Sequence, residues 1–193
     1  EKSVTIAGQP HDLEAPFHVL ATQNPLEQEG TYPLPEAQLD RFLMQIDVDY
    51  PDIEAERRIL METTGAEEAS AKKAISAKEL QKIQSLVRRM PVGESVVETI
   101  LGLVRSARPL EDGGEENAST KHIAWGPGPR ASQALMLTVR ARALLDGRLA
   151  PSVDDVLALA EPVLQHRMAL NFAARAEGVT VRSVVSELKQ SWM

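Results

Sequence analysis

From Asp52 to the end of the chain, apolar residues recur at intervals of three and four, and this pattern constrains the fold more than any other feature. Such spacing places apolar side chains along one stripe of an α-helix. Ser76 followed by Glu79, and Ser152 followed by Asp155, have the spacing of capping boxes at helix N-termini. We therefore predict a bundle of helices, with members starting at these caps and others at 94–107, from about 129 to 146, and at 181–190.

The first fifty residues have a different pattern. Val4 and Ile6 alternate with polar residues, 17–21 is a short apolar run bounded by polar residues, and 42–48 has the pattern of a further strand. Runs of this kind are typical of strands in a mixed or parallel sheet. The fold class that we predict is α/β plus all-α, with the end of an α/β layer at residues 1–50 and a helical domain at residues 51–193.

Composition excludes several classes of protein. The 193 residues include 21 basic and 28 acidic side chains, a net charge of −7, which gives no support to nucleic acid as a partner. The chain has no cysteine and its four histidines lack ligand spacing, so we expect no metal site formed by it. No apolar run approaches the roughly 18 residues needed to span a bilayer. We expect a cytoplasmic protein without a membrane span.

Asn24 is the first candidate site residue, because it lies just beyond the predicted strand at 17–21. Open α/β sheets place ligands at the carboxyl ends of their strands. The amide of Asn24 both donates and accepts, so it could orient a water molecule while contacting a terminal phosphate. The alternative is a simple Asn-Pro turn.

Arg41 lies near the end of a short segment that Pro35 could start as its first helical residue. It could pair with Glu36 or Asp40. It could instead project across a subunit boundary and stabilise charge on a transferred phosphoryl group.

Arg130 follows the sequence GPGP and falls in the first turn of a predicted helix. A positive charge there opposes the helix dipole by about 0.3 to 1 kcal/mol, so we expect an anionic group nearby. Helix N-termini are natural phosphate sites. The alternative is an exposed arginine with little energetic effect.

Three segments resemble the MoxR family of AAA+ ATPases: FHVLATQNP at 17–25, GTYPLPEAQLDRFL at 30–43 and PRAS at 129–132. The resemblance implies that Asn24 is sensor 1 and that Arg41 is the arginine finger, which reaches a neighbouring subunit's nucleotide. It implies that Arg130 is sensor 2. The fold implied is the carboxy-terminal remnant of an AAA+ αβα core followed by a helical-bundle lid domain.

Two motifs of such a core are missing from the chain. No glycine lies in a G-x-x-x-x-G-K-[ST] pattern, the Walker A loop that cradles phosphates. No Asp-Glu pair stands where a Walker B motif would hold magnesium. We therefore expect the sensor and lid portion of a larger enzyme, inactive alone and without the magnesium ligands.

The resemblance implies an ATP-binding and ATP-hydrolysing ring, expected to be a homo-hexamer, that uses ATP and Mg²⁺. It implies a chaperone for an unknown client, acting in the maturation of protein complexes or metal cofactors. Two alternatives remain. The chain could be a non-catalytic helical interaction and oligomerisation module. It could also come from another AAA+ branch, such as a magnesium-chelatase subunit or a ring helicase, although the acidic balance counts against the helicase.

Overall fold

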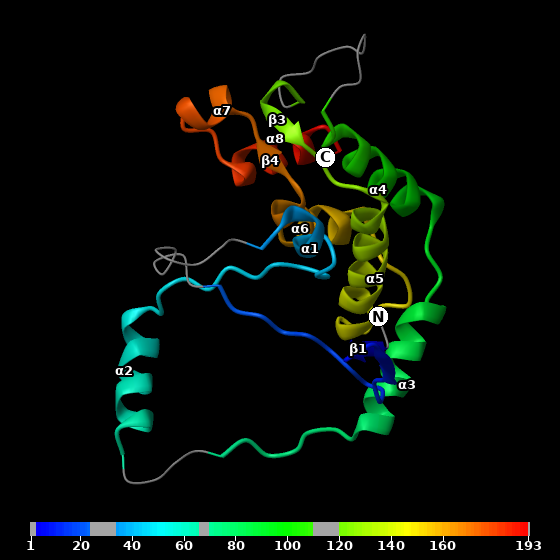
Figure 1. Ribbon diagram of the computed structural model, residues 1–193, viewed down its shortest axis with the longest axis vertical. Coiled ribbons are helices and arrows are strands. Elements are labelled where there is room, and N and C mark those ends of the chain that lie inside the picture. Colours follow the sequence, from blue (N-terminus) through cyan, green and yellow to red (C-terminus); the bar gives the residue numbers. More distant parts are fainter. Residues whose placement is uncertain (1–2, 24–33, 66–69, 110–119, 193) are drawn as a thin grey trace. The chain divides into compact units, whose positions relative to one another are not determined.

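The computed structural model describes residues 3–23, 34–65, 70–109 and 120–192 (Figure 1). The chain divides into two compact units. The first unit comprises Glu1–Leu20 and Ile46–Gln84, and the second unit comprises Ala21–Gln45 and Ser85–Met193.

The first unit begins with a β-hairpin. β1 (Ser3–Ile6) pairs antiparallel with β2 (Gln9–Asp12). The two residues between them, Ala7 and Gly8, have φ angles of 49° and 81°. A type I′ hairpin turn requires positive φ at both of its central positions. The alternation at Val4 and Ile6 is therefore confirmed as a strand, and its partner β2 follows after two residues.

The strands predicted at 17–21 and 42–48 are wrong. Neither run is a strand in the structure, and Leu20 and Val48 are 95% and 90% exposed. A strand needs a neighbour that exchanges backbone hydrogen bonds with it. In the described part of the chain, no segment pairs with either run, so apolar sequence alone does not make a strand here.

Two capped helices follow. α2 (Ile53–Thr63) starts at Asp52, whose carboxylate accepts a hydrogen bond of 2.7 Å from the Ala55 amide. α3 (Ala77–Arg89) starts with the predicted capping box, in which Glu79 accepts from the Ser76 amide at 2.7 Å and donates its own amide to Ser76 Oγ at 3.2 Å. The predicted start of α3 at Ser76 is confirmed, and α2 agrees with the helical spacing that begins after Asp52.

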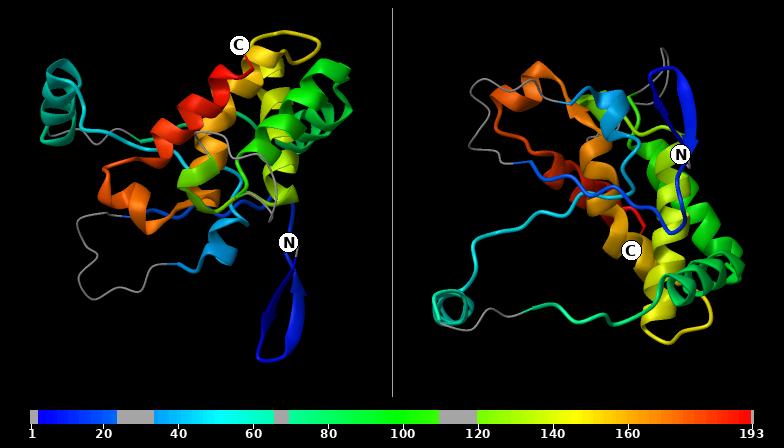
Figure 2. Two further views of the ribbon diagram at one scale, coloured as in Figure 1. Left: turned by 90° about the horizontal axis from the view of Figure 1, so that it is seen from above. Right: turned by 60° about the horizontal axis from the view of Figure 1, so that its bottom comes forward.

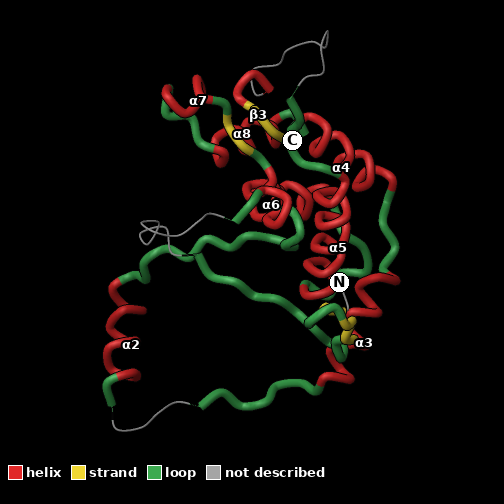
Figure 3. Tube along the Cα trace, in the orientation of Figure 1, coloured by secondary structure: helices red, strands yellow, loops and turns green. Residues whose placement is uncertain are grey.

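The second unit is mainly a bundle of helices, which are red in Figure 3. α5 (Pro129–Leu145) contacts both α4 (Glu94–Ser106) and α6 (Val153–Leu164), and α6 contacts α8 (Val181–Gln190). These helices lie side by side in the views of Figures 1 and 2. These four helices were predicted from the sequence, α4, α5 and α8 by their positions and α6 by its cap at Ser152.

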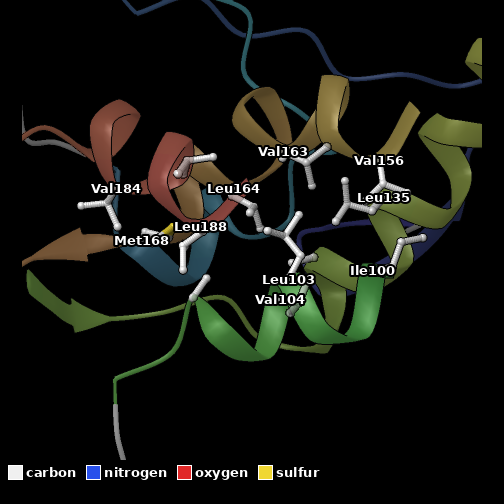
Figure 4. Packing of buried hydrophobic residues seen from close by; sticks show 14 of the residues in the cluster. Ile100, Leu103, Val104, Leu135, Val156, Val163, Leu164, Met168, Val184 and Leu188 are labelled. Atoms are coloured by element: carbon white, nitrogen blue, oxygen red, sulfur yellow. The ribbon is translucent and has the colours of Figure 1, made fainter. Parts of the chain in front are cut away.

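Aliphatic side chains form the core of this bundle (Figure 4). Leu103 on α4, Leu135 on α5 and Leu164 on α6 are fully buried. Trp192 packs against the same cluster, over Gly102. A Cβ atom added at Gly102 would lie 2.0 Å from the indole ring, so glycine is needed for this close approach.

Short elements join the ends of the bundle helices, and sequence analysis did not predict them. β3 (Ile123–Trp125) pairs antiparallel with β4 (Ala169–Leu170). Strands of two or three residues are too short for a periodic signal. Further short elements of this kind are the 3₁₀ turns η2 (Thr120–His122) and η3 (Gln165–Arg167) and the short helix α7 (Phe172–Ala176). Within the described ranges, no helix is both long and apolar enough to cross a bilayer.

Candidate functional site

The segment that carries Arg41 belongs to the second unit, where it lies against the end of α6. α1 (Glu36–Leu39) is a single turn preceded by Pro35. The Arg41 amide donates to Gln38 O at 3.2 Å, so this residue continues the turn just past the helix. Its side chain is exposed. Further along, the Gln45 amide donates to Pro162 O of α6 at 2.8 Å, which anchors the segment to the bundle.

A buried arginine, Arg167, holds the residues on both sides of Arg41. It is 1% exposed. Its Nε donates to Asp40 Oδ1 at 3.1 Å and its Nη2 to Asp40 O at 3.1 Å. Its guanidinium also donates to Phe42 O, and to Leu43 O at 3.3 Å. This one side chain therefore satisfies a carboxylate and three backbone carbonyls of the turn.

The guanidinium of Arg167 is itself fixed by the helix that it follows. Nη1 donates to Val163 O at 2.5 Å, which is one of the carbonyls left unpaired at the end of α6. Burial lowers the pKa of Arg167, and the neighbouring Asp40 carboxylate opposes that shift. Arginine stays protonated in proteins. The buried charge is thus tolerated because its hydrogen bonds are filled.

His166, the neighbour of Arg167, contacts the same turn. It is 7% exposed, and its Nε2 lies 3.3 Å from Phe42 O. Burial lowers the pKa of His166, and the positive charge of Arg167 lowers it further. Among the described residues, no group hydrogen-bonds its buried Nδ1. The neutral ring with Nε2–H donating to Phe42 O is the form that fits.

The stability of the second unit is expected to fall as the pH drops below the ordinary histidine pKa of 6.5. The unfolded chain takes up a proton at that value, whereas folded His166 takes it up only at lower pH. The unfolded state then binds more protons, so the free energy of unfolding decreases with falling pH. Urea unfolding at about pH 7.5 and about pH 5.5 measures this change. His166→Gln, which can still donate to Phe42 O, should have the smaller pH dependence, and an unchanged dependence would contradict the assignment.

Arg130 lies at the start of α5, in the first helical turn, as the sequence predicts. Its side chain is 54% exposed, and its Nη1 lies 3.7 Å from Asp40 Oδ2. The anionic neighbour that we expected is therefore the carboxylate that Arg167 also holds. Two guanidinium groups share one carboxylate, which leaves an excess of one positive charge at a helix N-terminus. Such a site suits an anion such as phosphate.

Gly126, three residues before the first residue of α5, determines how the chain enters this helix. A Cβ added at Gly126 would lie 2.4 Å from Ala107 O and 2.7 Å from Arg108 Cα, both backbone atoms that follow α4. The Arg108 Nε also donates to Pro127 O at 3.0 Å. The chain before Arg130 is therefore packed directly on the end of α4, which only a residue without a side chain allows.

Gly126→Ala is accordingly expected to destabilise the second unit by about 1 to 3 kcal/mol, because the backbone must shift to relieve the overlap. Gly128→Ala is the matched control, since a Cβ at Gly128 meets no atom within 4 Å and its φ is −83°. Urea denaturation followed by tryptophan fluorescence measures both variants. Equal midpoints for the two would show that the close approach at Gly126 is unimportant.

Asn24, the third predicted site residue, lies outside the described residues, so its role stays a prediction. In the described part of the chain, no three His, Cys, Asp or Glu side chains come together to hold a metal ion. The groups present, Arg41 and Arg130, have the chemistry for phosphate and not for magnesium.

Arg167 was not among the site residues predicted from the sequence. Its partner Asp40 is 127 residues away in the chain, so no local spacing connects them. The one signal available was a charged residue three positions after Leu164, at the apolar end of a core helix. A charge at such a position is fully buried only when it is paired.

Comparison with known proteins identifies the two parts of the chain. Residues 1–44 match the ATPase family associated with various cellular activities (AAA), and residues 115–188 match the AAA lid domain. Chaperone MoxR1 of Mycobacterium tuberculosis is 36% identical over 191 residues, which are 99% of this chain and 50% of that protein. The uncharacterized protein YeaC of Bacillus subtilis is 37% identical over 97% of this chain and 56% of that protein.

A solved structure of a candidate ATPase from Cytophaga hutchinsonii is also similar. It has a TM-score of 0.88 and 36% identity over 98% of this chain and 57% of that one. The chain spans about half the length of the curated relatives that it matches. These matches agree with the motifs around Arg41 and Arg130. The chain belongs to the MoxR family of AAA+ ATPases, with part of the AAA core at residues 1–44 and the AAA lid domain at residues 115–188.

Proposed function

We propose that the whole protein is a ring ATPase, a homo-hexamer that binds ATP at each subunit junction. This chain supplies sensor 1, the arginine finger and the lid, with the core ending near residue 50 and the lid occupying 51–193. The protein acts in the cytoplasm as a chaperone that matures protein complexes or their metal cofactors. The chaperone role is supported by the name of the Mycobacterium tuberculosis relative, MoxR1.

One observation supports the ATPase proposal. Asp40, the residue before Arg41 in the same turn, has its carboxylate 3.7 Å from the Arg130 guanidinium at the start of α5. Two arginines that the sequence places 89 positions apart are thus linked through Asp40, the residue next to Arg41. In the proposed mechanism, Arg130 contacts the nucleotide phosphates of its own subunit. Arg41 stabilises the charge that develops on the phosphates bound by the neighbouring subunit.

Asn24 is proposed to orient the attacking water in its own subunit, since an amide both donates and accepts hydrogen bonds. Rotation of the lid would move Arg130 toward or away from the phosphates, which couples the nucleotide state to a rigid-body movement. Magnesium, when bound, neutralises phosphate charge. The described residues do not fit its coordination, so we assign no magnesium ligand to them and derive no step from it.

The test is ATP turnover by this chain beside a form extended upstream to include a P-loop, called the extended protein below. We expect turnover only in the extended protein, because phosphates need the backbone amides and lysine of that loop. A fluorescent ADP analogue should likewise bind only the extended protein. If neither form hydrolyses ATP while both oligomerise, the chain is an interaction module and the ATPase proposal is wrong.

A further inference from the structure

We infer that Arg167 is a positioning residue for the arginine finger: from the lid of its own subunit, it sets where Arg41 stands. This inference rests on the proposed function of Arg41. It goes beyond that function because it assigns the placement of the finger to a buried lid residue that touches no nucleotide.

The contacts of Arg167 bracket Arg41 on both sides. Asp40, directly before it, is held through its carboxylate and its carbonyl, and Phe42, directly after it, is held through its carbonyl. Leu43 O is the next acceptor. The backbone at Arg41 is therefore fixed at both neighbours by one side chain.

The contacts of Arg167 with Asp40, Phe42 and Leu43, called the clamp below, are anchored in a packed helix. Arg167 lies in η3, which continues from α6, and its Nη1 is bonded to Val163 O inside that helix. α6 contributes fully buried residues to the core of the bundle. Groups held by packed helices are placed more reproducibly than groups on free loops. A shift of α6 would thus be transmitted to the turn that carries the finger.

Only arginine has the donors for this arrangement. Its planar guanidinium offers five N–H groups in a fixed fork, and it uses them here on five acceptors spread over Val163, Asp40, Phe42 and Leu43. Lysine keeps the positive charge for Asp40 but cannot hold the carbonyls in the same geometry. Arg167→Lys is therefore expected to preserve much of the charge pairing while loosening the turn.

The first measurement is the kinetic effect of Arg167→Lys in the extended protein. We expect kcat to fall about 10- to 100-fold, as for an active group misplaced by about 1 Å, while the affinity for fluorescent ADP changes by less than about twofold. Arg182→Lys is the matched control. Arg182 lies on α8, is 63% exposed and pairs with Glu161 of α6, the helix that Arg167 follows. It should leave both quantities unchanged.

The second measurement uses mixed rings, because a finger acts on the neighbouring subunit. Asn24→Ala subunits have a defective nucleotide side and an intact finger. Arg167→Lys subunits have an intact nucleotide side and a misplaced finger. In a 1:1 mixture about a quarter of the junctions would join an intact nucleotide side to an intact finger. Turnover of the mixture should therefore exceed that of either variant alone. A lid that was merely damaged would also impair its own nucleotide site and would not be rescued.

Arg41→Ala mixed with Asn24→Ala is the reference for this experiment. If that reference pair fails to complement, the proposed finger function of Arg41 is wrong, and so is the positioning role of Arg167. If the reference pair complements but Arg167→Lys does not, or if Arg167→Lys keeps full kcat, only the positioning role of Arg167 is overturned. Complementation by both pairs supports the inference.

Discussion

Replacing Arg41 with alanine in the extended protein is expected to lower ATP turnover by about 10³- to 10⁵-fold, the effect of an arginine finger on phosphoryl transfer. The guanidinium acts on charge that develops in the transition state, so its loss should lower kcat far more than nucleotide affinity. The structure is consistent with this role, because the Arg41 side chain is exposed while both flanking residues are held.

The matched control for this prediction is Arg175→Ala. Arg175 is also an exposed arginine of the second unit, on the short helix α7. Surface substitutions away from a site usually change stability by less than about 0.5 kcal/mol, so turnover should be nearly unchanged. Steady-state ATP hydrolysis and binding of a fluorescent ADP analogue give the two quantities. Normal turnover by Arg41→Ala would exclude the finger role.

The second large effect is on folding. Arg167→Met is expected to reduce the free energy of unfolding of the second unit by about 3 to 5 kcal/mol, since one partner of a buried ion pair is removed. The Asp40 carboxylate, whose side chain is only 20% exposed, would keep Arg130 alone at 3.7 Å. The Phe42 and Leu43 carbonyls would each lose the donor that Arg167 provides.

Urea denaturation followed by tryptophan fluorescence measures this loss, because Trp125 and Trp192 both belong to the second unit. Arg182→Met is the control. Its ion pair with Glu161, at 2.6 Å, is largely exposed, so its removal should cost no more than about 1 kcal/mol. Adding Asp40→Leu to Arg167→Met should recover part of the loss, because the unpaired carboxylate is then gone. A loss for Arg167→Met no larger than for Arg182→Met would contradict the clamp.

The two predictions test the stability and the function of the same turn, residues 40–43. Arg167→Met tests whether the buried clamp holds the turn to the bundle, and Arg41→Ala tests what the turn presents to a neighbouring subunit. Because methionine is expected to destabilise the lid, it is unsuitable for testing positioning. Arg167→Lys, which retains the charge, is the variant for that purpose.

The sequence alone determined the longer helices and where they start. The capping boxes at Ser76 and Ser152, and the apolar spacing after each, are local features. A helix closes its hydrogen bonds within four residues, so these features decide the outcome without distant partners. The positions of Arg41 after a short turn and Arg130 in a first helical turn were predictable for the same reason.

The tertiary structure decided everything that depends on distant partners. The apolar runs at 17–21 and 42–48 have the composition of strands, but in the described residues neither has a neighbour to pair with. Arg167 was not among the predicted site residues, and only the fold brings it to Asp40 across 127 positions. The free energy of a buried charge depends on whether its partner is in place. That partnership is a property of the packed chain, and no local pattern in the sequence contains it.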